Sequence, residues 1–154
     1  MKNREESIRN FIGVFELLGV KLAEVYHICV DPKDDISKQE FSLIGFLGQH
    51  ANENVIMRDI VEFLEVPYST ATGIVDKLVQ KKFLKRYNPP QDRRTVMICL
   101  TPKKGKAMYE KYIQKKFELG TLVMNALDEN EQDQLIAILQ KISDKMVKKT
   151  EEAG

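Results

Sequence analysis

The chain has 154 residues, 43% of them hydrophobic and 31% charged, which is typical of a folded, helix-rich protein with one sizeable core. No stretch approaches the roughly 20 apolar residues that span a bilayer, and the charged N-terminus does not look like a secretory signal. We therefore expect a cytoplasmic protein without a membrane partner. Two distant cysteines, Cys29 and Cys99, and only two histidines argue against a disulfide framework and a zinc site, so neither metal nor cofactor is expected.

The net charge is only +1, but its distribution is uneven. Residues 77–106 contain ten lysines and arginines against one acid, Asp92, which gives this segment a charge of +9. The remaining residues carry 14 basic against 22 acidic side chains. Such asymmetry directs one face toward phosphate and repels the others. A solvated surface without a partner would also explain the charge alone.

The first predicted helix covers residues 7–29. Its apolar side chains recur at alternating spacings of three and four, which is a heptad seam. Other apolar residues widen the stripe beyond what one neighbouring helix covers. We expect this helix to contact both its own domain and a second subunit. The seam consists of Ile8, Phe11, Phe15, Leu18, Leu22, Val25 and Cys29.

Three shorter helices follow. Ser37 and Glu40 have the spacing of a capping box and begin a helix that runs to about residue 49. Residues 55–56 form a minimal strand, and residues 58–64 form a short helix that Pro67 separates from the next one. That next helix, residues 68–82, carries small polar residues on one face and apolar residues on the other.

Residues 83–87 and 95–100 alternate between apolar and polar side chains and are predicted strands of a β-hairpin. The turn between them, residues 88–94, exposes Asp92, Arg93 and Arg94. A polar helix followed by a basic hairpin is typical of a winged helix-turn-helix, which places the helix in the major groove of DNA and a hairpin arginine in the minor groove.

Two long amphipathic helices complete the chain. Thr101 and Pro102 open the first, and a second capping signal at residues 128–131 opens the last. The predicted fold is therefore mainly α with a small β-hairpin wing (α+β), a winged helix-turn-helix between N- and C-terminal dimerisation helices. We assign residues 1–154 to one domain, residues 7–30 and 103–148 to dimerisation helices, and residues 37–101 to the DNA-binding lobe.

Essentially the whole chain resembles the multiple-antibiotic-resistance regulator (MarR) family. The most specific parts of the resemblance are the segments Ser69–Leu78, Asp92–Arg94 and Ile98–Pro102. The resemblance implies a homodimeric winged-helix transcriptional regulator, in most cases a repressor, which many members release from DNA through a small ligand or cysteine oxidation. The resemblance implies that Arg94 enters the minor groove and that the carboxylate of Asp92 fixes the geometry of that arginine. Two departures concern specificity: Gly73 stands where members often have a basic residue, and Lys82 stands where a glycine usually follows the helix.

The DNA-binding set expected from the residues and the resemblance lies on the polar helix and the hairpin. Three hydroxyls within four positions disfavour helix and suit contacts with phosphates or base edges. An acid at a DNA-facing tip would repel phosphate unless it orients an arginine. The set is Tyr68, Ser69, Thr70, Thr72, Gly73, Lys77, Arg86, Asp92, Arg93 and Arg94.

The main prediction is a homodimeric, sequence-specific regulator of an inverted-repeat duplex DNA site, a repressor that a small-molecule effector releases. The effector candidates are Tyr26, Phe46, Met57 and Tyr112, each of which would also suit a plain core. A thiol-based redox sensor and a winged helix that contacts proteins are the alternatives. No residue arrangement suggests catalysis, so no enzyme is expected. The effector and the operator sequence are left open.

Overall fold

The computed structural model describes the backbone of residues 3–152 and the side chains of residues 3–146 except Leu22 and Val25, two positions of the predicted seam that lie outside the described side chains. The chain divides into two compact units, residues 1–115 and 116–154. Helix α5 (Lys104–Met124) crosses this division. None of the helices in the described part of the chain combines the length and apolar character needed to cross a membrane.

The first unit begins with α1 (Arg4–Cys29). This helix starts three residues earlier than predicted because the Asn3 side chain accepts a hydrogen bond from the Glu5 amide at 3.2 Å and acts as the N-cap. A short 3-10 turn, Pro32–Asp34, leads to α2 (Lys38–Gln49). The predicted capping box is present: the Glu40 amide donates to Ser37 Oγ at 3.1 Å, and the Ser37 amide donates to Glu40 Oε2 at 2.8 Å.

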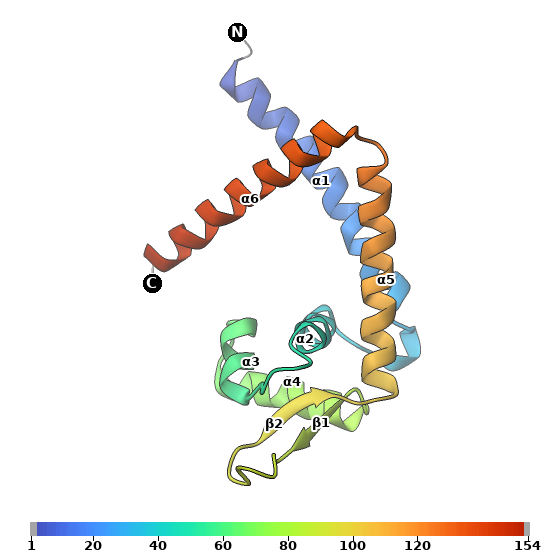
Figure 1. Ribbon diagram of the computed structural model, residues 1–154, viewed down its shortest axis with the longest axis vertical. Helices are drawn as coiled ribbons and strands as arrows, with labels where there is room; N and C mark the ends of the chain where they lie inside the picture. Colours follow the sequence, from blue (N-terminus) through green and yellow to red (C-terminus); the bar gives the residue numbers. More distant parts are fainter. Residues whose placement is uncertain (1–2, 153–154) are drawn as a thin grey trace. The chain divides into compact units, whose positions relative to one another are not determined.

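Helices α3 (Met57–Leu64) and α4 (Tyr68–Gln80) pack against each other and on α2. They form one lobe with strands β1 (Leu84–Tyr87) and β2 (Met97–Leu100) (Figure 1). The strands pair antiparallel, with Lys85 opposite Cys99. The predicted strand at residues 55–56 is a single bridge from Ile56 to Met97. This arrangement confirms the predicted winged helix, in which the wing consists of β1, β2 and the intervening residues 88–96.

The core lies where these elements meet. Its side chains come from every element of the lobe, so burial of apolar surface fixes how α4 and the wing are held on α2. The largest fully buried side chains are Phe83, Leu43, Ile44, Ile60, Leu78, Leu84, Ile98 and Val75.

Helix α4 ends two residues earlier than predicted, at Gln80, in a left-handed turn. Lys82 has φ 67°, the conformation that a glycine adopts most easily. The amide of Phe83 donates to Leu78 O at 2.9 Å and that of Lys82 to Val79 O at 3.0 Å, which is the Schellman pattern. The turn therefore closes in the usual geometry although a lysine occupies the left-handed position.

Among the described side chains of α1, Cys29 near the C-terminal end is the buried one. The remaining described apolar side chains of its seam, such as Phe11 and Phe15, are solvent-exposed within the single chain. The expected contact with its own domain is thus confined to the last turn of the helix.

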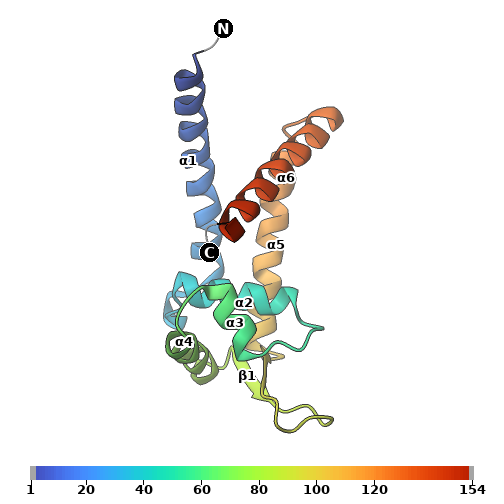
Figure 2. The same ribbon diagram turned by 90° about the vertical axis from the view of Figure 1, so that its left-hand side faces the viewer.

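The second unit contains the end of α5 and α6 (Glu129–Glu152), which begins at the second predicted capping signal. The Glu131 amide donates to Asp128 Oδ1 at 2.9 Å, and the Asp128 amide donates to Glu131 Oε2 at 3.0 Å. Figure 2 shows α6 as one continuous helix.

Candidate nucleic-acid interface

The first turns of α4 present a polar, open face. Tyr68 is 62% exposed, and Ser69 and Thr70 are exposed beside it, whereas Thr72 and Gly73 are half-buried. Pro67 stands at the N-cap of α4, and no side chain among the described residues caps the helix. The free amides and the positive end of the helix dipole favour a bound anion at this end.

Thr72 contributes less than the sequence suggests. Its hydroxyl donates to the Tyr68 carbonyl at 2.9 Å, one helical turn earlier. The proton is therefore used within the helix, and only the oxygen lone pairs remain for a ligand. Apart from the backbone of its own helix and its two chain neighbours, no atom of the described residues lies within 4 Å of a Cβ placed on Gly73, so this position is open.

The C-terminal end of α4 is anchored to α2 by a buried carboxylate. Glu40 is only 4% exposed, and its Oε2 lies 3.2 Å from Lys81 Nζ. The same ammonium donates to the carbonyl of Asp35. A buried charge must be paired and hydrogen-bonded, and Glu40 meets both requirements through Lys81 and the Ser37 amide. This contact fixes the exposed face of α4 relative to the rest of the lobe.

Arg86, a member of the predicted DNA-binding set, is paired with Asp76 of α4. The Arg86 guanidinium lies 2.6 Å from Asp76 Oδ1, and both side chains are partly exposed. Sequence reasoning missed Asp76, because its partner is ten residues away on another element. The pair joins α4 to the wing and reduces the charge that Arg86 offers to DNA. Lys77, next to Asp76, is exposed.

Side-chain hydrogen bonds from Asn88 and to Asp92 stabilise the turn at the tip of the wing. Asn88 Nδ2 donates to the carbonyls of Arg93 at 3.0 Å and Thr95 at 3.1 Å. Asp92 Oδ1 accepts from the Arg94 amide at 3.0 Å, and Asp92 Oδ2 accepts from the Thr95 hydroxyl. Asparagine is a common turn residue, which is the signal that would have identified Asn88.

The role of Asp92 differs in one respect from the resemblance. Its carboxylate holds the backbone of Arg94 rather than its guanidinium. The hydrogen bonds from the Thr95 side chain and the Arg94 amide lower the pKa of Asp92, so it is ionised at neutral pH. Among the described residues, neither the Arg93 nor the Arg94 side chain has an ion-pair or hydrogen-bond partner, and both are exposed.

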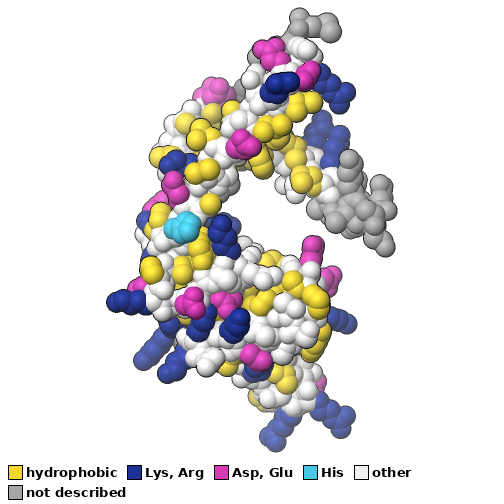
Figure 3. Space-filling view, turned by 180° about the vertical axis from the view of Figure 1, so that it is seen from behind, with side chains coloured by type: hydrophobic (Ala, Val, Ile, Leu, Met, Phe, Trp, Pro, Cys, Tyr) yellow, Lys and Arg dark blue, Asp and Glu magenta, His cyan; other side chains and the backbone are white. Residues whose placement is uncertain are grey.

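Carboxylates neutralise three of the ten basic side chains in the segment 77–106. Lys81, Arg86 and Lys104 are paired with Glu40, Asp76 and Asp34, the last pair at 2.6 Å. The other seven basic side chains have no carboxylate partner in the part of the chain that the structure describes: Lys77, Lys82, Lys85, Arg93, Arg94, Lys103 and Lys106. Figure 3 shows basic side chains projecting at the wing end of the lobe.

The ring contacts of the four effector candidates fall into separate groups. Phe41 makes edge-to-face contacts with Tyr26 at 5.4 Å and Tyr112 at 5.2 Å between ring centroids, which links those two. Phe46 instead stacks on Phe63 at 4.3 Å. Tyr26 also borders a hollow of about 300 Å³ near the end of α1. Met57 lies at the start of α3.

The two thiols lie in protected positions. Cys29 is buried and Cys99 half-buried, and burial raises the pKa of each above its ordinary value. Both are therefore protonated at neutral pH, which disfavours a reactive thiolate. No group of three or more potential metal ligands occurs among the described residues.

The sequence of this chain is similar to known transcriptional regulators. The sequence profile of the MarR family matches residues 34–95. The transcriptional regulator BilQ of Clostridium symbiosum is 31% identical over 126 residues, which cover 79% of this chain and 82% of BilQ. The transcriptional repressor YetL of Bacillus subtilis is 25% identical over 104 residues, 68% of this chain and 62% of YetL.

Solved structures of MepR from Staphylococcus aureus share the fold. MepR bound to ethidium bromide superposes with a TM-score of 0.69 at 23% identity, covering 88% of this chain and 96% of MepR. A MepR variant bound to an oligodeoxyribonucleotide gives a TM-score of 0.61, covering 88% and 97%. The winged-helix lobe, the matched profile and the regulators of the helix-turn-helix type together confirm the resemblance seen in the sequence: the chain belongs to the MarR family of DNA-binding transcriptional regulators.

Proposed function

We propose that the protein is a homodimeric repressor that binds an inverted-repeat site in duplex DNA and is released by a small-molecule effector. One observation carries the proposal. The open polar face of α4 and the exposed Arg93 and Arg94 lie on one lobe, and the basic segment 77–106, which contains both arginines, keeps seven basic side chains without a carboxylate partner among the described residues.

In this proposal α4 enters the major groove. Ser69, Thr70 and the free amides of the first turn contact phosphates or base edges. Arg94 enters the minor groove, where an arginine responds to groove width and therefore to A·T-rich sequence. The hydrogen bond from the Arg94 amide to Asp92 holds the Arg94 backbone in place, which reduces the conformational entropy lost when the wing binds DNA. Arg93 and Lys77 neutralise phosphates.

The dimer is supported by the exposed apolar seam of α1. Phe11 is 58% and Phe15 63% exposed within the single chain, and their rings stack on each other at 5.5 Å. Contiguous apolar surface of this kind marks a protein interface. Two copies related by a two-fold axis would present two α4 helices to successive major grooves, about 10 base pairs apart.

Repression and effector release are supported by the relatives. YetL is a repressor, and MepR was solved both with an oligodeoxyribonucleotide and with ethidium. A regulator with this fold can thus bind both DNA and a small molecule. The relatives are transcriptional regulators, a class without catalytic activity.

The test begins with selection of bound DNA from random duplexes. The affinity of the wild-type protein for the selected duplex is then measured as a function of salt and compared with an Arg93→Ala/Arg94→Ala variant. We expect the variant to bind about 10- to 100-fold more weakly, with a salt slope smaller by about two, because two phosphate-facing or groove-facing charges are lost.

The matched control is Lys33→Ala/Lys38→Ala, which removes the same charge from exposed positions outside the interface. Its affinity should stay close to that of the wild type. Equal affinity of the wing variant and the wild type would contradict the wing assignment. Sedimentation of Phe15→Glu, expected to be monomeric and to lose DNA binding, tests the dimer separately.

A further inference from the structure

The outward side of α4 carries one carboxylate. Asp76 is the one acidic residue among the thirteen of this helix, and its side chain is 57% exposed. Ala71, Val75 and Leu78 of the same helix are fully buried against the lobe. With 3.6 residues per turn, Asp76 lies on the side of the helix opposite to these three, the side that the proposed function turns toward the major groove. An unpaired carboxylate there would repel the phosphates of DNA.

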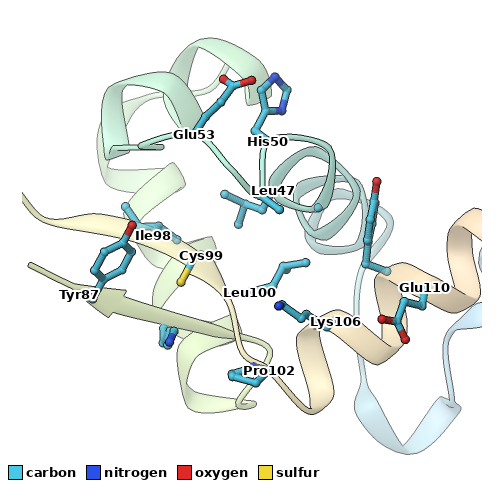
Figure 4. A pocket seen from close by; sticks show the side chains of 14 residues that line it. Leu47, His50, Glu53, Tyr87, Ile98, Cys99, Leu100, Pro102, Lys106 and Glu110 are labelled. Atoms are coloured by element: carbon cyan, nitrogen blue, oxygen red, sulfur yellow. The ribbon is translucent and has the colours of Figure 1, made fainter. Parts of the chain in front are cut away.

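Arg86 removes that repulsion and leaves the carboxylate exposed. Its guanidinium lies 2.6 Å from Asp76 Oδ1. Tyr87, the next residue of β1, lines the hollow between α2, α5 and the wing (Figure 4). Because side chains alternate between the two faces of a strand, Arg86 lies on the other face, where the ion pair joins it to α4. The pair is neutral as a whole, and it holds the carboxylate in one orientation from the side of the wing.

One oxygen of Asp76 is available to a ligand. Within the described part of the chain, the hydrogen bond from Arg86 reaches Oδ1, and none reaches Oδ2. Glu40 and Asp92 of the same lobe differ, because each uses both of its oxygens within the protein. An exposed carboxylate oxygen that is held in place and lacks a donor is suited to a hydrogen bond from DNA.

Gly73 allows α4 to lie close to a base edge. It is on the outward side one turn before Asp76, and beyond the local helix backbone no described atom lies within 4 Å of a Cβ placed there. Glycine permits the close approach of a backbone to a ligand. The side chain of aspartate is short, so it reaches a base only when the helix lies deep in the groove. The missing side chain at Gly73 supplies the space for that approach.

We propose that Asp76 is a specificity-determining residue that accepts a hydrogen bond from the amino group of a cytosine, with Arg86 as the residue that positions its carboxylate. In the major groove the cytosine amino group is a donor, whereas guanine and thymine present acceptors. Adenine also has an amino group there, but its N7 acceptor lies beside it and repels a carboxylate. The inference rests on the proposed function, because it requires α4 in the major groove.

The experiment starts from the duplex that the wild-type protein selects, with each base pair replaced in turn in both half-sites. Dissociation constants are measured for the full-length protein at one salt concentration. We expect one position at which the wild type prefers cytosine over each other base by at least about 10-fold, and at which Asp76→Ala shows no preference. The charge that this variant frees on Arg86 changes the affinity for all duplexes alike, so it cancels in the ratio.

Three further variants separate base reading from packing. Asp76→Asn adds an amide donor beside the acceptor oxygen, so the preference at that position should move toward adenine, which an amide contacts through N6 and N7. Arg86→Gln leaves the carboxylate without its positioning partner, and the cytosine preference should fall several-fold. Gln80→Ala is the matched control, because Gln80 is exposed on the same outward side one turn later. This variant should keep the cytosine preference at that position.

A modified base tests the contact without any change in the protein. N4-methylcytosine at the preferred position places a methyl group on the amino group in the major groove and keeps the base pair with guanine. It should weaken binding of the wild type several-fold and leave binding of Asp76→Ala unchanged. A cytosine preference that survives in Asp76→Ala, or equal binding of the wild type to the methylated and the plain duplex, would overturn the proposal.

The outcomes separate this inference from the proposed function. A protein that selected no duplex would refute the proposed function and this inference with it. A duplex bound with a steep salt dependence, but with the same base preferences in the wild type and Asp76→Ala at every position, would refute the role of Asp76 alone. The binding of DNA through α4 and the wing would then stand.

Discussion

Gly105 is the position where the root of the wing is most sensitive to an added atom. A Cβ at this residue would lie 2.2 Å from the carbonyl oxygen of Phe83, far inside the 3.4–4 Å of ordinary contact, and 3.1 Å from Leu100 Cβ. That carbonyl also accepts the Thr101 amide at 2.9 Å, so it cannot move away without loss of a hydrogen bond. Gly105→Ala should therefore displace the junction between β1 and α5.

The expected cost follows from three contributions. Overpacking against backbone costs about 3 kcal/mol, the upper part of the usual range. Weakening of the Thr101–Phe83 hydrogen bond adds about 1 kcal/mol, and the better helix propensity of alanine returns about 1 kcal/mol. The free energy of unfolding should thus fall by about 3 kcal/mol, which for a chain of this size lowers the Tm by about 6–12 °C.

Gly73→Ala is the matched control, because the added Cβ meets none of the described atoms within 4 Å beyond the local helix backbone, and the residue is also inside a helix. It should raise the free energy of unfolding by about 0.5–1 kcal/mol. Urea unfolding followed by circular dichroism, at one protomer concentration for all variants, measures both. A Gly105→Ala protein as stable as the wild type would refute the close approach and the argument built on it.

Lys82→Gly should raise the free energy of unfolding by about 0.5–1 kcal/mol, because relief of the left-handed strain exceeds the added chain entropy, whereas Lys82→Ala should give no such gain in the same urea assay. The pKa of Asp92 is lowered in the folded protein, so the contribution of this carboxylate to stability is complete at neutral pH and is lost as the pH falls through that lowered pKa. In an NMR titration that follows the Arg94 amide, the midpoint should therefore lie at a pH below the ordinary carboxyl range. A midpoint at or above that range would contradict the hydrogen bonds of Asp92 at the wing tip. Asp76→Asn should free Arg86, raise DNA affinity several-fold and steepen the salt slope by about one, and an unchanged slope would show that the pair already opens on DNA.

The local features of this protein could be predicted from the sequence with few errors. Helix starts such as that of α2 depend on residues three apart, Ser37 and Glu40, whose hydrogen bonds form within one turn. The hairpin depends on alternation and on a turn of prolines and polar residues, which are equally local. The helical periods and the basic segment were sufficient to indicate a winged helix, because each signal acts over a few residues.

Other features depend on residues that only folding brings together. The pairs Asp76–Arg86 and Glu40–Lys81 join different elements, and they decide which basic side chains keep a free charge. Lys82 takes a left-handed conformation that local preference opposes, since burial of Phe83 and the Schellman hydrogen bonds outweigh the strain. Lys85, Cys99 and Lys106 likewise border one hollow because the strand register sets Lys85 opposite Cys99 and the start of α5 adds Lys106. Tertiary packing sums many weak contacts over distant residues, and no window of the sequence contains that sum.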